Sequence, residues 1–69
     1  MTLSARNRLE GTVKSVKTDG LMGEVVVELE GGQEMTSTIT SNSVERLGIE
    51  EGATVEVVVK ATEVMINKD

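Results

Sequence analysis

The 69-residue sequence contains no cysteine, no histidine and no aromatic residue, and each absence excludes a class of function. Without cysteine there is no disulfide and no thiolate metal site. Without histidine the chain lacks the commonest general base and the commonest metal ligand. Without phenylalanine, tyrosine or tryptophan it has no side chains on which the bases of single-stranded nucleic acid stack.

Positive charge and long apolar runs are also scarce. The formal net charge is −5, which argues against a nucleic-acid partner because phosphate neutralisation dominates that kind of affinity. No stretch approaches the roughly 20 apolar residues of a membrane helix, and the N-terminus has no apolar h-region of a signal peptide. We therefore expect a cytoplasmic protein without a nucleic-acid or membrane partner.

The length predicts a single domain over residues 1–69 that associates with other copies of itself. A domain of about 60 residues buries only about 60% of the surface that its unfolded chain exposes. Chains of this size usually need a covalent staple, a metal or an oligomer to gain enough burial. With no cysteine in the sequence, association is the expected solution.

What the sequence does contain is short segments with the alternation of half-buried strands. In residues 24–30, for example, valines and a leucine alternate with glutamates, and Gly31-Gly32 then predicts a tight hairpin turn. A helix of one to two turns is expected from Asn42, with Glu45 at capping-box spacing and Gly48 as a stop. Strands are expected at residues 9–16, 24–30, 33–40, 54–60 and 63–66. This order predicts an all-β fold, a small five-stranded OB-like Greek-key barrel with one short helix between strands 3 and 4.

Catalytic material is poor, and we expect no enzyme and no catalytic residue. No general base stands at a recognisable spacing from a serine, threonine or lysine nucleophile. Most of the twelve acidic residues alternate with apolar ones, as on a solvated strand face. Neither a calcium loop nor a phosphate-binding loop is present.

Anion binding is better supported by the residues. The segment "TSNS", residues 40–43, offers hydroxyl groups and unpaired backbone N–H groups where the short helix begins, and such a helix start attracts oxyanions. The alternative is plain helix capping, because serine and asparagine cap helices in many proteins. Arg6 and Lys60 are likewise either ligands of an anion or ordinary surface charges.

Three motifs together favour the anion site over these alternatives. "SARN" followed by L-x-G, T-x-x-S-V-x-x-L-G, and K-A-T-x-V-M-I occur in this order along the chain. In this combination the sequence resembles the molybdenum-binding Mop domain family, the molbindins. The same module is found in molybdate-responsive transcription regulators and in the accessory domain of molybdate-importer ATPases. The resemblance extends from Ser4 to Ile66.

The resemblance implies an oxyanion site at subunit interfaces in a hexamer built as a trimer of dimers. No protein atom ligates the metal directly and no cofactor is implied, because molybdenum is bound as the oxyanion. The motif positions that carry the family's site are Ser4, Ala5, Arg6, Thr40, Ser43 and Lys60, together with Asn7, which belongs to the first motif.

The resulting prediction is a protein that binds molybdate, and with it tungstate, for intracellular molybdenum storage, buffering or homeostasis. An older family name refers to a molybdenum-pterin, but a pterin pocket would need aromatic or extended polar walls. The main alternative is a small OB-like structural or adaptor domain that binds a protein partner, with the hydroxyls as ordinary caps. A nucleic-acid-binding OB fold and a catalytic role in cofactor synthesis are weaker alternatives.

Overall fold

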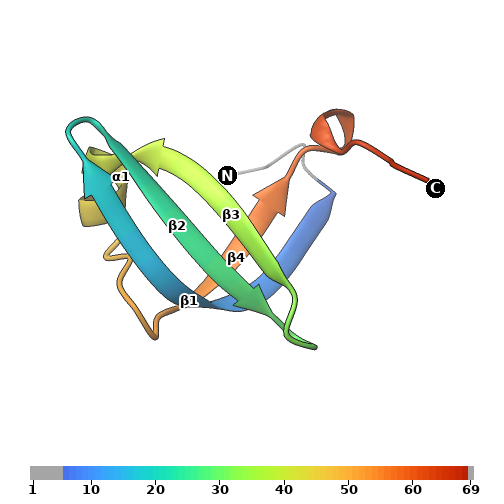
Figure 1. The fold of residues 1–69 in the computed structure, drawn as a ribbon, viewed down its shortest axis with the longest axis horizontal. Coiled ribbons are helices and arrows are strands. Elements are labelled where there is room, and N and C mark those ends of the chain that lie inside the picture. The colour runs from blue at the N-terminus through green and yellow to red at the C-terminus, as the bar shows by residue number, and fades with distance from the viewer. Residues whose placement is uncertain (1–5, 69) are drawn as a thin grey trace.

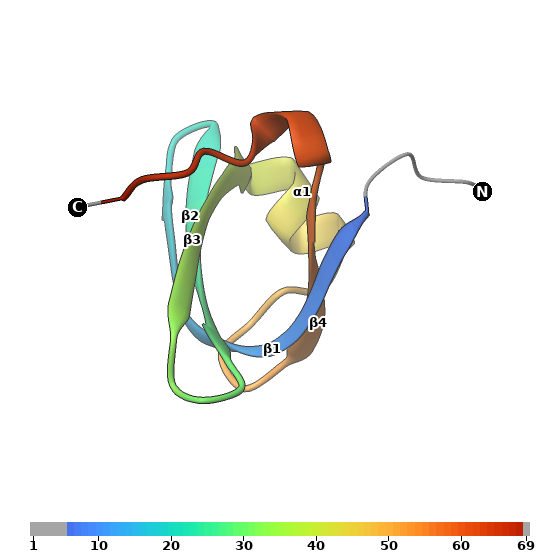
Figure 2. The same ribbon diagram turned by 90° about the vertical axis from the view of Figure 1, so that its right-hand side faces the viewer.

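The computed structural model describes residues 6–68, which form one curled antiparallel sheet and a short helix (Figure 1). The sheet bends round on itself, as the view from the side shows (Figure 2). The elements in chain order are β1 (Asn7–Asp19), β2 (Met22–Leu29), β3 (Glu34–Thr40), α1 (Ser41–Arg46), β4 (Thr54–Val59) and the 3-10 turn η1 (Ala61–Glu63).

Strand β1 pairs with a strand on each side, in a sheet whose strand order is β3-β2-β1-β4. Its first half, from Asn7 to Thr12, pairs with β4, and its second half, from Gly11 to Asp19, pairs with β2. The register with β2 shifts between Val13 and Ser15. An extra residue in one strand increases local twist and bends the strand, which is how one 13-residue strand serves both halves of a curled sheet.

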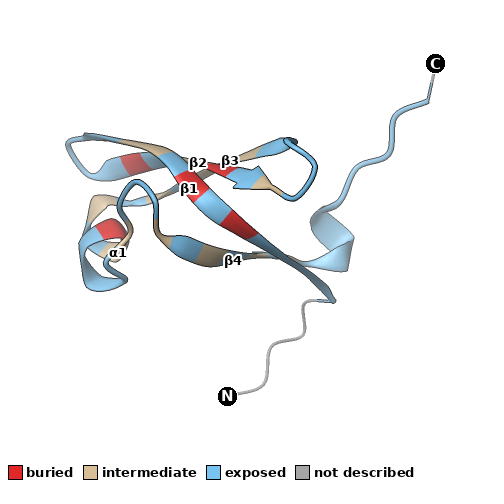
Figure 3. Ribbon diagram, turned by 90° about the horizontal axis from the view of Figure 1, so that it is seen from below, coloured by how far each residue is buried: buried red, intermediate tan, exposed pale blue. Residues whose placement is uncertain are grey.

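The core consists of valines, and two of them, Val25 and Val27, stand at positions that alternation predicted. Val13, Val25, Val27 and Val44 are buried, and the neighbouring inward-facing residues of β3 and β4 are half-buried (Figure 3). The hairpin turn is also confirmed, because Gly31 and its neighbour Gly32 have φ values of +92° and +88°, which glycine adopts without strain.

Two glycines permit close approach inside this small core. A Cβ atom on Gly11 would lie 2.5 Å from Val27 Cγ1, and one on Gly23 would lie 2.9 Å from Val44 Cγ2. Real Cβ atoms do not approach other atoms so closely, so these positions need glycine. The second contact lets α1 lie directly against the start of β2.

The prediction of a fifth strand at residues 63–66 is wrong for the single chain. Residues 61–63 form η1, and residues 64–68 have no strand assignment. The apolar side chains in this segment suggested a strand, but a strand also needs a neighbour, and here Met65 and Ile66 are 92% and 88% exposed. The first strand is longer than the predicted 9–16, because pairing with β4 extends it at its start and pairing with β2 extends it at its end. A four-stranded curled sheet with one short helix is therefore the observed fold.

No helix within residues 6–68 is long and apolar enough to cross a membrane.

Candidate oxyanion-binding site

The first group of predicted site residues lies where β1 begins and β4 ends. Asn7 is paired with Val59 across these two strands, so Arg6, just before this pair, and Lys60, just after it, come from adjacent chain segments. Both side chains are exposed. The register thus brings two positive charges that are 54 residues apart in the sequence to the same end of the sheet. Ser4 and Ala5, predicted to complete this group, lie outside the described residues.

The second group lies where β3 runs into α1. Thr40 has extended backbone angles, φ −72° and ψ 147°, and its side chain accepts a hydrogen bond from the Ser43 backbone N–H at 3.1 Å. The Thr40 hydroxyl also donates to the Ser43 Oγ at 2.8 Å. These two predicted residues are therefore in direct contact.

The predicted helix start at Asn42 is wrong. Because β3 continues to Thr40, the hydroxyl of this residue reaches the first turn and acts as the N-cap, and Asn42 lies inside the helix. The helix start is also tied to the β1–β2 turn, since the Ser41 backbone N–H donates to the Leu21 carbonyl and the Ser41 hydroxyl to the Gly20 carbonyl, each at 2.8 Å. This anchoring fixes where the Thr40 and Ser43 hydroxyls stand.

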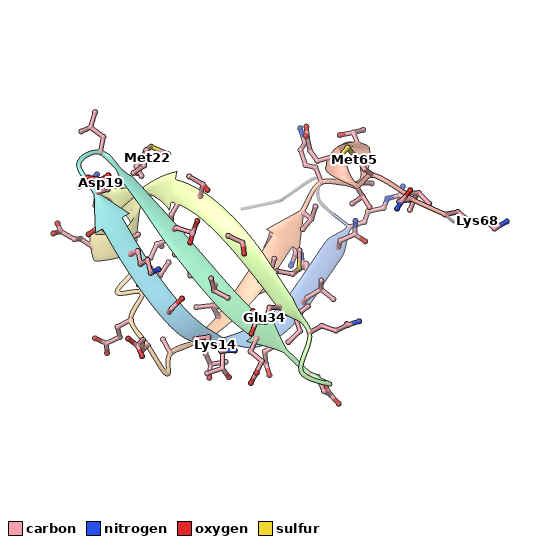
Figure 4. All side chains as sticks on the ribbon, in the orientation of Figure 1. Lys14, Asp19, Met22, Glu34, Met65 and Lys68 are labelled. Carbon is pink, nitrogen blue, oxygen red and sulfur yellow. The ribbon has the colours of Figure 1, made fainter. Side chains whose placement is uncertain are left out.

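The two groups lie at opposite ends of the sheet. Thr40 pairs with Met22, which pairs with Asp19 at the end of β1, whereas Val59 pairs with Asn7 at its start. Figure 1 is drawn with the longest axis horizontal, and α1 lies toward one end of it while η1 lies toward the other. Figure 4 shows the same separation between the labelled Asp19 and Met22 and the labelled Met65. The molecule measures 35 Å along that axis, so one chain alone does not bring the two groups to one small anion.

Negative charge is concentrated on the outer face of the sheet, between these two ends. Glu10 is directly opposite Glu56, and Glu28 is opposite Glu34. Like charges in such cross-strand positions repel, and Lys14 relieves part of this repulsion by an ion pair with Glu34 (Figure 4).

The neighbouring glutamates also change the pKa of Lys14. The hydrogen bond to Glu34 and the negative charge of Glu34 raise the pKa of Lys14 above the ordinary value of 10.5, and the charge of Glu28 adds to the effect.

A nearby pocket of about 260 Å³ contains three glutamates, Glu10, Glu28 and Glu30, among its lining residues. This region of the sheet repels a dianion. No group of three or more carboxylates within residues 6–68 is arranged to hold a metal ion.

One residue near the second group was missed by sequence reasoning. The Arg46 Nη2 lies 3.5 Å from the Ser43 Oγ. Residues three apart on a helix are neighbours on its surface, so the spacing in "SVER" contained the signal. The group at the start of α1 therefore consists of two hydroxyls and one guanidinium.

Known proteins are similar to this chain over nearly its whole length. The family model of the TOBE domain matches residues 3–66. Molybdenum-pterin-binding protein 2 of Clostridium pasteurianum is 50% identical over 66 residues, which is 96% of this chain and 97% of that protein. Molybdenum-pterin-binding protein 1 of the same organism is 48% identical with the same coverage.

Solved structures of similar proteins have the same fold as this chain. MopII from Clostridium pasteurianum superimposes with a TM-score of 0.91 at 48% identity, covering 97% of this chain and 100% of that one. A molybdate-binding protein from Sporomusa ovata superimposes with a TM-score of 0.92 at 38% identity, covering 99% and 100%. Matched in both sequence and fold, the chain belongs to the TOBE domain family and, within it, to the Mop proteins, or molbindins.

Proposed function

We propose that this protein binds molybdate, and with it tungstate, as the bare oxyanion. The observation that carries the proposal is the pairing of Asn7 with Val59, because it places the motif cations Arg6 and Lys60 on adjacent segments. The motif hydroxyls Thr40 and Ser43 form the other half of the site. Relatives of this chain include a protein described as molybdate-binding, which supports the choice of ligand.

The donor set suits a tetrahedral dianion. Molybdate oxygens are acceptors at neutral pH, so a selective site needs donors from several directions and no carboxylate in contact. The guanidinium of Arg6 and the ammonium of Lys60 neutralise the two charges, and charge-assisted bonds of this type are about twice as strong as neutral ones. The hydroxyls of Ser4 and Ser43, the Ala5 backbone N–H and the neighbouring Asn7 supply the remaining contacts in this proposal. Thr40 belongs to the same group and donates its own proton to the Ser43 Oγ.

A free oxyanion fits better than a molybdenum-pterin. The relatives' names refer to a pterin, but this chain contains no aromatic residue on which a pterin ring would stack. The described part of the site contains short hydroxyls and exposed cations, which match the oxygens of a small anion.

The complete site is formed between copies of the chain. The two groups of residues lie at opposite ends of β1, so the cations of one copy meet the hydroxyls of another in this proposal. The assembly is a hexamer, a trimer of dimers. Strands β3 and β4 are the open edges of the sheet, and Met65 and Ile66 are exposed apolar side chains; such features mark interfaces. The predicted five-stranded OB-like barrel would be completed only in this assembled form.

In the cell, the proposed role is storage or buffering of molybdenum in the cytoplasm, without catalysis. The alternative, an adaptor domain that binds a protein partner, requires Thr40 and Ser43 to be nothing more than helix caps. Their mutual hydrogen bond is compatible with both roles, so the ligand decides between them.

Isothermal titration of the full chain with molybdate, tungstate, sulfate and a single-stranded oligonucleotide tests the proposal. We expect heat and saturation with the first two, and none with the oligonucleotide. A crystal soaked in molybdate then locates the heavy anion, expected between the Lys60 end of one copy and the Thr40 end of another. No saturable binding of molybdate or tungstate would overturn the proposal and favour the adaptor.

A further inference from the structure

The hydroxyl of Ser43 is in an unusual position for a surface serine, because two donors already point at its oxygen. Thr40 donates to the Ser43 Oγ at 2.8 Å, and the Arg46 Nη2 donates to the same atom at 3.5 Å. A serine hydroxyl has two acceptor lone pairs and one proton. With both lone pairs engaged, the hydroxyl has its proton left to offer.

This arrangement determines what Ser43 is able to bind. A hydroxyl that retains only its donor function pairs with an acceptor and offers nothing to a donor. Bonds from a guanidinium, even long ones, also polarise the hydroxyl, since hydrogen bonds in a chain strengthen one another. Half-buried Ser43 is thus held ready for a ligand whose oxygens carry no proton.

We propose that Arg46 is a positioning residue of the oxyanion site, which acts through Ser43 by directing the proton of that hydroxyl toward the ligand. This inference rests on the proposed function, because it takes Ser43 as one of the residues that contact the anion. It assigns to the site a third arginine or lysine side chain that the motifs do not include. Arg46 makes no contact with the anion itself in this scheme.

The alternative is that Arg46 acts without Ser43, because its positive charge attracts the anion directly. The two modes differ in their dependence on Ser43. If Arg46 acts through the hydroxyl, its effect disappears when the hydroxyl is removed. If it acts by charge alone, its effect persists.

A double-mutant cycle with isothermal titration of molybdate separates them. Arg46→Met is expected to weaken binding roughly three- to tenfold, the effect of one hydrogen bond of ordinary net strength. In a Ser43→Ala background the same change is expected to alter affinity by less than about twofold. Binding remains measurable in that background because Arg6 and Lys60 are retained. Arg46→Gln, which keeps an N–H donor without the charge, is expected to bind more tightly than Arg46→Met.

Lys17→Gln serves as the matched control, because it removes one exposed positive charge from the same end of β1 without touching Ser43. It is expected to leave affinity within about twofold of the wild type, as for other surface charges. Thermal melting without ligand should not distinguish these surface variants from the wild type.

The outcomes are distinct. An equal loss from Arg46→Met in both backgrounds, no loss in either, or equal affinities for Arg46→Met and Arg46→Gln would overturn the inference while leaving the proposed function intact. Failure of the wild-type protein to bind molybdate would overturn the proposed function, and the role of Arg46 with it.

Discussion

Two variants that each destroy half of a site should restore binding when they are combined in one assembly. Lys60 and Ser43 lie at opposite ends of β1, and we infer that each complete site takes them from different copies. Lys60→Ala and Ser43→Ala are each expected to weaken molybdate binding by about ten- to a hundredfold, because each removes a hydrogen bond that involves a charged partner, worth about 1.5–3 kcal/mol.

In a mixture of the two variants, some sites regain both residues. A Lys60→Ala copy still carries Ser43, and a Ser43→Ala copy still carries Lys60. With equal amounts and random assembly, each residue is present in half of the sites, so about one quarter of the sites between copies are wild type. Sites within single chains would all lack one residue, and none would regain wild-type affinity.

The assay is equilibrium dialysis of molybdate after the variants have been mixed in denaturant and refolded together. The molybdate concentration is set between the dissociation constants of the wild type and of the single variants. Native mass spectrometry of the refolded sample verifies that mixed oligomers have formed. Mixed oligomers without any sites of wild-type affinity would refute the reasoning.

The control mixture pairs Lys60→Ala with Arg6→Ala. These residues lie on adjacent segments of one copy, next to the Asn7–Val59 pair, and contribute to the same half of the site. Every copy in this mixture lacks one of the two cations, so no site regains both. Recovery in the first mixture and not in the second would place the division of the site between the two ends of β1.

Three further predictions follow from the fold and the site. A hundredfold excess of molybdate over its Kd should stabilise the protein by about 2.7 kcal/mol per site, seen as a higher Tm that equimolar chloride does not produce. Gly23→Ala should lower the free energy of unfolding by about 1–3 kcal/mol, since its new Cβ would lie 2.9 Å from Val44 Cγ2; an unchanged urea midpoint would contradict that contact. The raised pKa of Lys14 implies a stabilising contribution that is complete below the ordinary pKa of 10.5 and is lost as pH rises through the folded-state value. Glu34→Gln should therefore lessen the loss of stability at alkaline pH, and identical alkaline melting profiles would argue against the pair.

The parts of the fold that depend on local periodicity could be predicted from the sequence. Alternating residues placed Val25 and Val27 inward, and the Gly31-Gly32 pair predicted the hairpin turn, because both signals are contained in a few consecutive residues. The fifth strand could not be assigned in this way. Residues 63–66 have the composition of a strand, but whether they pair depends on a neighbour that the single chain does not supply.

The start of the helix and the placement of the site residues likewise depend on strand length and register, which short motifs do not contain. Asn42 and Glu45 have the spacing of a capping box, yet Thr40 is the N-cap, because the length of β3 decides which hydroxyl reaches the first turn. The motifs predicted the residue types of the proposed site. That Thr40 and Lys60 lie at opposite ends of one molecule depends on strand register across the whole sheet, which no local motif contains.

The length of β1 gives the proposed binding protein an apparent affinity that depends on its own concentration. In the proposed assembly each copy carries its two half-sites at opposite ends of the 13-residue strand β1, so dilution that separates the copies would also separate the half-sites and release the anion. Binding and assembly are reciprocal, so each promotes the other by the same factor. A cell that makes more of this protein would therefore gain tighter sites as well as more of them, and one that degrades it would release its molybdenum before the last copies are gone.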